Sequence, residues 1–424
     1  MRISSLAIDS YKSIIKPLSL KLDPRINIFI GQNNSGKTNL MDAIDFVFNP
    51  TKSPSRLHHH RAHIVVRLDT NQTISADGYE VRGVTADISQ KIKRLSADEP
   101  WDFEAIGRDY QRLYQRYPQD YQAVNEVFAS YFPHIAGDDR AIDLDWQAGH
   151  AYIHEDDKPM VLERLGSGFQ KIFIILLYAF HPDYPLVLLD EPETHLHPAL
   201  IKKLAKVLAT KARNQILLTT HSPLFIQTPW LSSINRVVRS WNEGTVVYHL
   251  DPHHRGLDPT RLVQELNADN LEMFFADKVL MVEGASDRLL MRGLIDRFYR
   301  GPLEIKVIEA HGKGNMELYR DLLLAFHIPS LIMLDLDALD AWLPTGQARH
   351  GLQHHPARLE AALRGLREQH IFILSNGTIE RNYPRRYQKS DRKTINAMRA
   401  AVQISPTEYQ SAEMFNVRQV IEAL

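Results

Sequence analysis

The segment from residue 31 to residue 38 reads Gly-Gln-Asn-Asn-Ser-Gly-Lys-Thr and fits the phosphate-loop pattern G-x-x-x-x-G-K-[ST]. The backbone N–H groups of such a loop surround a phosphate at the positive end of the following helix. Lys37 would reach the β- and γ-phosphates of ATP, and the hydroxyl of Thr38 would be a ligand of Mg²⁺. The predicted nucleotide-binding residues of this loop are Gly31, Asn33, Asn34, Ser35, Gly36, Lys37, Thr38 and Asn39.

Two acidic residues directly follow an apolar run at residues 186–189, which predicts a buried strand that ends at a metal and water site. With a phosphate loop upstream, Asp190 would hold the Mg²⁺ shell and Glu191 would polarise the attacking water. The alternative is a core strand that ends in surface acids. His221 also follows an apolar run, at a predicted strand end where α/β ligand sites gather, although a lone histidine is more often structural.

The second half of the chain carries a different set of acids. Glu283 and Asp335 directly follow apolar segments, and Glu380 comes shortly after a third. Asp287 lies in the first turn of a predicted helix, and Asp337 forms an Asp-x-Asp pair whose two side chains would share one face of a strand. Oxygen ligands without His or Cys favour Mg²⁺ or Mn²⁺. Two such ions would stabilise both oxygens of an in-line phosphodiester displacement, whereas ordinary surface turns are the alternative.

Strands and helices must alternate to position these residues. A strand at 26–30 precedes the phosphate loop, and an amphipathic helix at 39–48 follows it. In the second half, helical stretches separate four predicted strands at residues 278–282, 305–309, 330–334 and 371–374. This βαβαβ order predicts a parallel sheet whose carboxyl edge carries the acids. The predicted fold class is therefore α/β.

Length and composition limit the possible functions. The chain has 424 residues, enough for two or three domains, and a net charge of -1, so a nucleic-acid site must be a local patch. The absence of cysteine excludes disulfides and cysteine-ligated zinc and fits a reducing cytoplasm. No signal peptide is recognisable, and the longest apolar run, 172–180, is too short to span a bilayer. We therefore expect a cytoplasmic protein without a membrane partner.

Three regions follow one another along the chain. Residues 1–250 are predicted to form the nucleotide domain, in which residues 50–150 are an inserted and mainly helical segment with a strand at residues 64–68. A linker helix within residues 251–275 leads to a second domain at 276–424. The histidines at residues 58–60 are expected to be a solvated loop segment rather than a metal site.

The first half resembles the ATPase heads of the ABC superfamily, in its SMC-like branch. The resemblance covers residues 1–245 and implies a Walker A loop at Lys37 and a Walker B strand at Asp190. It also implies that His221 is the switch histidine. Ser167 and Gly168 match the signature motif, whose serine contacts the γ-phosphate bound to a second head, although Phe169 stands where that family usually has glycine.

The second half, over residues 276–385, resembles the Toprim domain of topoisomerases, primases and a group of nucleases. An SMC-like head followed by this domain resembles the OLD (overcoming lysogenization defect) family of ATP-dependent nucleases. The resemblance implies ATP, one Mg²⁺ at the ATPase site, and two divalent metals at the Toprim site. The implied ligands of these two metals are Glu283, Asp287, Asp335, Asp337 and Glu380. It further implies a lysine that stabilises the transition state, for which Lys393 is the first choice and Lys389 the second.

The same resemblance implies a set of partners. DNA is the expected substrate, and the implied assembly is a homodimer or a higher homo-oligomer, in which the inserted segment could dimerise. Relatives that are antiviral effectors encoded beside a helicase or a reverse transcriptase suggest a defence role. Two alternatives stay open. One is a topoisomerase-like strand transferase, and the other is an ATP-driven DNA-binding scaffold or sensor with an inactive Toprim domain.

Overall fold

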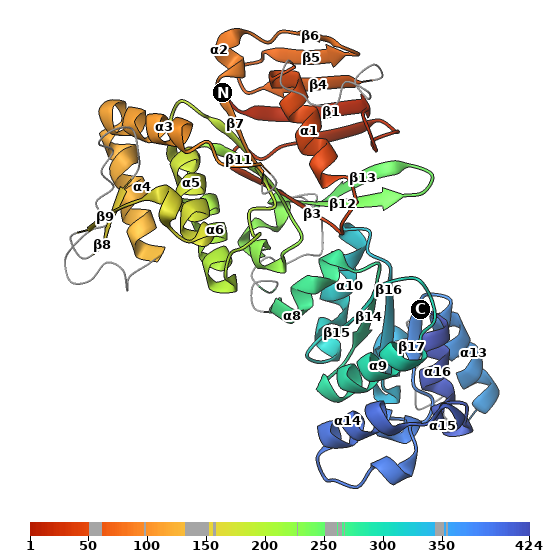
Figure 1. Cartoon of the computed structure of the whole chain (residues 1–424). Coiled ribbons are helices and arrows are strands. Elements are labelled where there is room, and N and C mark those ends of the chain that lie inside the picture. Colours follow the sequence, from red (N-terminus) through yellow and green to blue (C-terminus); the bar gives the residue numbers. More distant parts are fainter. Residues whose placement is uncertain are drawn as a thin grey trace. The chain divides into compact units, whose positions relative to one another are not determined.

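The computed structural model describes residues 1–50, 62–96, 99–131, 152–155, 158–226, 228–250, 261, 265–266, 268–343, 352 and 355–424. The histidines at residues 58–60 lie outside these ranges, as does most of the predicted linker between residues 251 and 267. The chain divides into two compact units, Met1–Leu250 and Asp251–Leu424 (Figure 1).

The first unit is built on a six-stranded sheet in the order β13-β12-β3-β11-β10-β7. All neighbouring strands are parallel except β12 and β13, which are antiparallel. Every residue of β3, β10 and β11 is buried, so these strands form the centre of the core. The strands are β3 (Ile26–Ile30), β7 (Ile92–Ser96), β10 (Leu186–Asp190), β11 (Gln215–Thr220), β12 (Ile234–Ser240) and β13 (Gly244–His249).

An antiparallel sheet in the order β2-β1-β4-β5-β6 completes this core. Helix α1 (Lys37–Phe48), which follows the phosphate loop, packs against strands of both sheets, and apolar residues of all three elements form one cluster. This packing fixes the start of α1 at the carboxyl end of β3, where the phosphate loop lies. The strands are β1 (Ile3–Ser10), β2 (Leu18–Lys21), β4 (His63–Leu68), β5 (Thr73–Asp77) and β6 (Glu80–Arg82).

The expectation of a mainly helical insertion at 50–150 is wrong for residues 73–82 and 92–96, which form strands, whereas the strand expected at residues 64–68 is confirmed as part of β4. Strands β4 to β6 belong to the antiparallel sheet, and β7 forms the edge of the parallel sheet beside β10. Among the described residues of this segment, the predicted amphipathic helices are α3 (Phe103–Arg116) and α4 (Pro118–Tyr131). The remaining elements are α2 (Ala86–Ser89), β8 (Tyr152–Glu155), β9 (Lys158–Val161), α5 (Ser167–Phe180) and α6 (Pro198–Thr210).

The second unit has a four-stranded, fully parallel sheet in the order β15-β14-β16-β17. This confirms the predicted parallel sheet and the α/β fold class. The strands are β14 (Lys278–Val282), β15 (Ile305–Glu309), β16 (Ser330–Leu334) and β17 (Ile371–Ile373). Because all four run in one direction, their carboxyl ends share one edge of the sheet.

Helices pack around this sheet, and α14 lies against α9 (Figure 1). Part of the linker helix predicted within residues 251–275 is present as α8, which continues as a 3₁₀ turn at Glu272–Phe275. No helix in the described ranges is long and apolar enough to cross a membrane. The helices are α8 (Ala268–Leu271), α9 (Ala285–Phe298), α10 (Met316–Ala325), α11 (Leu339–Trp342), α13 (Pro356–Arg367), α14 (Lys393–Gln403), α15 (Pro406–Tyr409) and α16 (Phe415–Glu422).

Candidate functional site

The two glycines of the phosphate loop are required by the space around them. Gly36 has φ +104°, and a Cβ atom there would lie 2.1 Å from the hydroxyl oxygen of Thr245. A Cβ atom on Gly31 would lie 2.2 Å from the carbonyl oxygen of Val237. Gly36 is also the N-cap of α1 and gives it no side-chain cap, so the first N–H groups of the helix are not satisfied by a capping side chain. A phosphate group fits this arrangement.

Lys37 lies inside the loop. It is buried, and its ammonium group donates to the carbonyl oxygens of Gly31 and Gln32, both at 2.9 Å. Burial lowers the pKa of Lys37, while the nearby carboxylates of the Walker B segment oppose that shift. The hydroxyl of Ser35 is buried and has no hydrogen-bond partner among the described residues, which fits a site completed by a ligand.

The other predicted loop residues surround this centre. Thr38 and Asn33 are exposed. Asn34 has a left-handed backbone, with φ +63°, and its side-chain oxygen accepts from Arg239 at 3.1 Å. Asn39 donates to the hydroxyl of Ser13 and thus belongs to the wall behind the loop.

Asp190 is the last residue of β10 and is buried. Its carboxylate accepts a hydrogen bond from the hydroxyl of Thr219 on the neighbouring strand β11. Its other oxygen lies 3.3 Å from the guanidinium of Arg94, which also pairs with Asp42 of α1 at 2.6 Å. Arg94 thus connects the Walker B strand to the helix that follows the phosphate loop. No motif marks Arg94 in the sequence, because a single arginine on an edge strand belongs to no recognisable pattern.

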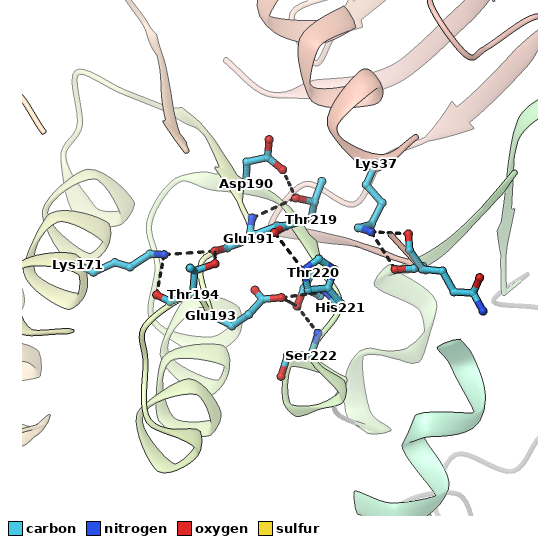
Figure 2. A network of polar contacts seen from close by, with 12 residues as sticks. Lys37, Lys171, Asp190, Glu191, Glu193, Thr194, Thr219, Thr220, His221 and Ser222 are labelled. Carbon is cyan, nitrogen blue, oxygen red and sulfur yellow. Dashed lines mark hydrogen bonds and ion pairs between the residues drawn. The ribbon is translucent and has the colours of Figure 1, made fainter. Parts of the chain in front are cut away.

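Glu191 occupies a left-handed backbone position, with φ +49°, directly after β10. Its N–H donates to the carbonyl oxygen of Thr219 at 3.1 Å, and its carbonyl oxygen accepts from Lys171 and Thr194 (Figure 2). Its carboxylate lies 3.0 Å from Nε2 of His221. The structure therefore brings together the predicted water-polarising acid and the predicted switch histidine.

Glu193 is a residue of this site that the sequence reading missed. One carboxylate oxygen accepts from the backbone N–H of His221 at 2.9 Å and from the hydroxyl of Thr220 at 2.6 Å (Figure 2). Its other oxygen and Nδ1 of His221 are both buried, and neither has a hydrogen-bond partner among the residues that the structure describes. Glu193 therefore fixes the segment that carries the histidine. The signal for it was a third acid after the strand, in the run Asp-Glu-Pro-Glu.

Ser167 and Gly168 open helix α5, whose later residues are buried. Ser167 is exposed, and its N-cap neighbour Gly166 supplies no side-chain bond. Among the described residues, no hydrogen bond joins Ser167 to the phosphate loop of its own chain. An exposed serine at a helix start is compatible with a contact to a phosphate held elsewhere.

The acids of the second unit gather at the carboxyl edge of its sheet. Glu283 follows β14 and accepts a hydrogen bond from the backbone N–H of Asp335, which follows β16, at 3.2 Å. Asp287, in the first turn of α9, is buried and accepts from the N–H of Gly284 at 3.1 Å. Glu283, Asp287 and Asp335 therefore lie together at this edge, as the sequence predicted.

Burial and mutual repulsion shift two of these carboxyls. Burial raises the pKa of Asp287 to about 7, with smaller contributions from Glu283, Glu380 and Glu309. The pKa of Asp335 is also raised to about 7, first by burial and then by Asp287 and the other acids. Such shifts are typical of carboxylates that a cation would stabilise.

Asp335 and Asp337 do not share one face of a strand, contrary to the sequence prediction. Strand β16 ends at Leu334, and Asp337 lies in a 3₁₀ turn at Leu336–Ala338, where its side chain is exposed. The two acids are still close enough for Asp337 to raise the pKa of Asp335. The turn replaced the strand because the parallel sheet ends before the pair.

Glu380 and the predicted lysine form an ion pair. The ammonium of Lys393, at the start of α14, lies 3.1 Å from the Glu380 carboxylate. Burial would raise the pKa of Glu380, but hydrogen bonds from Thr378 and Lys393 lower it overall. Lys389 is exposed and makes no ion pair with the described residues, so the geometry favours Lys393 for a role beside the acids.

The donor chemistry of this site fits a hard divalent cation, because all five groups are carboxylates. Within the part of the chain that the structure describes, no three His, Asp or Glu side chains are already placed to hold a metal ion. Binding would therefore require these side chains to rotate toward one another. Their specific role as metal ligands stays a prediction.

Sequence models of three families match this chain. Residues 1–99 match an AAA ATPase domain, and residues 67–227 match the AAA domain of AbiEii-type toxins from type IV TA systems. Residues 274–337 match the TOPRIM domain of overcoming lysogenization defect protein-like sequences. These matches agree with the phosphate loop in the first unit and the acid-bearing parallel sheet in the second.

Three curated nucleases are similar to part of this chain. The OLD nuclease of Thermus scotoductus is 28% identical over 43% of this chain and 37% of its own length. Endonuclease GajA of Bacillus cereus is 27% identical over 41% of this chain and 31% of its own length. The Old nuclease of Escherichia phage P2 is 22% identical over 45% of this chain and 36% of its own length. The matched part of this chain thus spans about a third of the length of these relatives.

Solved structures of SMC heads are also similar to the chain. The SMC head domain from Thermotoga maritima covers 59% of this chain and 100% of its own, with 16% identity and a TM-score of 0.38. A score this low assigns no fold.

The phosphate loop with its Walker B acids, followed by an acid-edged parallel sheet, defines an ATPase–Toprim protein. The TOPRIM match and the nuclease relatives show that the chain is similar to OLD-family proteins, in agreement with the resemblance seen in the sequence.

Proposed function

We propose that this chain is an ATP-hydrolysing DNA endonuclease. Its Toprim unit would cut phosphodiester bonds with divalent metal ions, and its ATPase unit would control the cutting. The observation that carries the proposal is the pairing of two sites in one chain. One is a phosphate loop facing Glu191 and His221, and the other is a cluster of mutually repelling carboxylates beside Lys393.

At the ATPase site, each residue has a distinct task. The loop N–H groups and Lys37 bind the phosphates, and Thr38 and Asp190 would hold the Mg²⁺ that neutralises phosphate charge. Glu191, held 3.0 Å from His221, accepts a proton from the attacking water. Ser167 contacts the γ-phosphate on a second copy, so the working form is a homodimer or a higher homo-oligomer.

At the Toprim site, the acids Glu283, Asp287, Asp335, Asp337 and Glu380 would hold two Mg²⁺ or Mn²⁺ ions. These ions supply charge stabilisation for the attacking and leaving oxygens of the phosphodiester. Lys393 contributes a positive charge beside Glu380 and is placed to stabilise the developing phosphate charge.

A plasmid-cleavage assay tests this function. Purified protein would meet supercoiled DNA with Mg²⁺ or Mn²⁺, with and without ATP. The Glu283→Ala variant should lose cutting and keep ATP hydrolysis, because the two sites lie in different units. The Lys37→Ala variant should lose ATP hydrolysis, and its cutting would show whether ATP activates or restrains the nuclease. Unchanged cutting by Glu283→Ala would contradict the proposal.

A topoisomerase-like reaction is disfavoured by the tyrosine near these acids. Tyr383 is only 1% exposed. Burial raises its pKa to about 12, and the negative charges of Glu380 and Asp287 act in the same direction. A phenol in this position is a poor nucleophile for DNA. Capture of a covalent protein–DNA adduct would overturn this reading.

The cellular setting belongs to the same proposal. We expect a cytoplasmic, antiviral defence effector that acts with a co-encoded helicase or reverse transcriptase component. Co-purification from the native host would test the partner, and phage plating on cells with the Glu283→Ala variant would test the defence role.

A further inference from the structure

A strongly basic segment follows the last acid of the Toprim site. Residues 381–399 contain seven Lys and Arg residues and a single Asp, a net charge of +6 in a chain whose total is -1. The remainder of the chain is therefore net acidic. A local concentration of this kind is the electrostatic footprint expected of a polyanion site.

Most of these cations are not neutralised by a carboxylate. Arg386 pairs with Glu408 at 2.6 Å, and Lys393 pairs with Glu380. The other five are exposed and make no ion pair with any residue that the structure describes. These five residues, here called the basic surface, are Arg381, Arg385, Lys389, Arg392 and Arg399.

Hydrogen bonds within the segment hold the basic surface in a fixed shape. Asn396 is buried and bonds the backbone of Ser390 in both directions, at 3.0 and 2.7 Å. The side chain of Gln388 donates to the backbone oxygen of Glu380. The loop that carries Lys389 and Arg392 is therefore tied both to α14 and to a predicted metal ligand.

Helix α14, which carries Arg399 and has Arg392 as its N-cap, begins next to the acids. Its last turn lies against the later turns of α9, because Arg297 donates to the carbonyl oxygen of Ala401 at 2.7 Å. Its first turn lies toward the acids, because Lys393 contacts Glu380. Glu380 in turn raises the pKa of Asp287 in the first turn of α9. The unpaired cations thus begin at the rim of the candidate cutting site.

The segment offers charge but no exposed aromatic ring. Its two aromatic residues, Tyr383 and Tyr387, are 1% and 4% exposed. Proteins that bind unpaired bases usually stack them on exposed aromatic side chains. The basic surface therefore suits the phosphate backbone rather than the bases.

We propose that the basic surface binds the phosphodiester backbone of the nucleic acid that the Toprim site cuts, without reading its sequence. This inference rests on the proposed nuclease function and adds to it the surface that carries the substrate. Binding should be steeply salt-dependent and indifferent to base sequence, because each phosphate contact releases a condensed counterion.

Binding of the full-length protein to a fluorescent DNA duplex, in EDTA and over a series of KCl concentrations, tests this. The Arg385→Gln/Arg392→Gln double variant should bind about tenfold more weakly. The slope of log K against log [KCl] should also become shallower by about 2. Two duplexes of unrelated sequence should give the same slope.

The matched control removes two exposed arginines from helix α13, Arg358→Gln and Arg364→Gln, with the same change in net charge. This pair should leave affinity and slope unchanged. An equal loss in both double variants would show a general charge effect and overturn the proposal, as would unchanged binding by the first. Repeating the titration with a hairpin RNA shows whether the surface binds a DNA or an RNA backbone. Binding to anionic lipid vesicles but to neither nucleic acid would also overturn the proposal.

A cleavage assay distinguishes failure of the binding proposal from failure of the proposed nuclease function. In Mg²⁺, the Arg385→Gln/Arg392→Gln variant should cut at a raised KM for DNA with a nearly unchanged kcat. Glu283→Ala should bind the duplex in EDTA like the wild type and not cut. If the wild type binds through the basic surface but never cuts, the nuclease function fails and the binding surface stands.

Discussion

At the scale of single residues, the ATPase site is held together mainly by contacts to backbone. Glu193 bonds the N–H of His221, and Lys171 bonds the carbonyl oxygen of Glu191. The Glu191 carboxylate then meets the His221 ring at 3.0 Å. These contacts make the acid–histidine pair depend on the loop after β10 as much as on the two side chains.

The Glu191→Gln variant should bind ATP normally and hydrolyse it at least about 100-fold more slowly, because the amide cannot accept the proton of the attacking water. Binding of a fluorescent nucleotide and steady-state phosphate release would measure the two effects. Glu104→Gln, on the exposed side of α3, is the control and should hydrolyse ATP normally. Normal hydrolysis by Glu191→Gln would mean that another group is the base.

The raised pKa values of Asp287 and Asp335 predict how stability depends on pH. Both groups have a pKa of about 7 when folded, against an ordinary value near 4 when unfolded. Between these values the folded protein binds more protons, so its stability falls as pH rises through that window. The metal-free protein should therefore melt at a lower temperature at about pH 8 than at about pH 5.

Added Mg²⁺ should reverse this loss at the higher pH, because the ion stabilises the ionised carboxylates. Asp287→Asn should show a weaker pH dependence, since it keeps the shape of the side chain without the charge. Thermal unfolding in EDTA and in Mg²⁺ would check both points. A melting temperature that does not change with pH would contradict the assignment.

At the scale of elements, the close packing of the phosphate loop against β12 and β13 leaves no room for side chains. Gly36→Ala should weaken ATP binding by about tenfold or more, because the new methyl group meets Thr245 and the residue must keep φ +104°. Gly365→Ala on α13 is the matched control, since nothing lies within 4 Å of its Cβ position. Equilibrium nucleotide titration of both variants would decide the point.

The sequence predicted those elements whose residues follow one clear period. Apolar runs in the sequence mark the buried strands that precede the phosphate loop, the Walker B acids and the Toprim acids. All four Toprim strands lie where they were expected. Strand β7 was missed because Lys93 and Arg94 interrupt its apolar residues at an edge of the sheet. The Asp337 turn was missed because nothing in the residues marks where β16 ends.

The contacts of the site were harder to predict than its members. Arg94 and Glu193 reach Asp190 and His221 only through the pairing of strands distant in sequence. These contacts depend on which strands pair and in which register, and a single sequence does not reveal that pairing.

At the scale of the whole molecule, the proposed role of Ser167, which is exposed at the start of α5, requires a second copy of the chain. The rate of ATP hydrolysis per chain should rise with protein concentration, because the serine would complete a site on a second copy. Ser167→Ala should weaken that rise, while nucleotide binding to a single chain stays normal. A rate that is independent of concentration, in the range where sedimentation shows a change of mass, would contradict this.

The left-handed backbone at Glu191 has a consequence for evolution and engineering. A non-glycine residue in this conformation costs about 1 kcal/mol or more, a strain that glycine would relieve. Glu191→Gly should therefore raise the melting temperature while abolishing turnover. Selection for stability alone would remove this acid, so its presence is expected if Glu191 has the proposed role in ATP hydrolysis and stability was traded for activity.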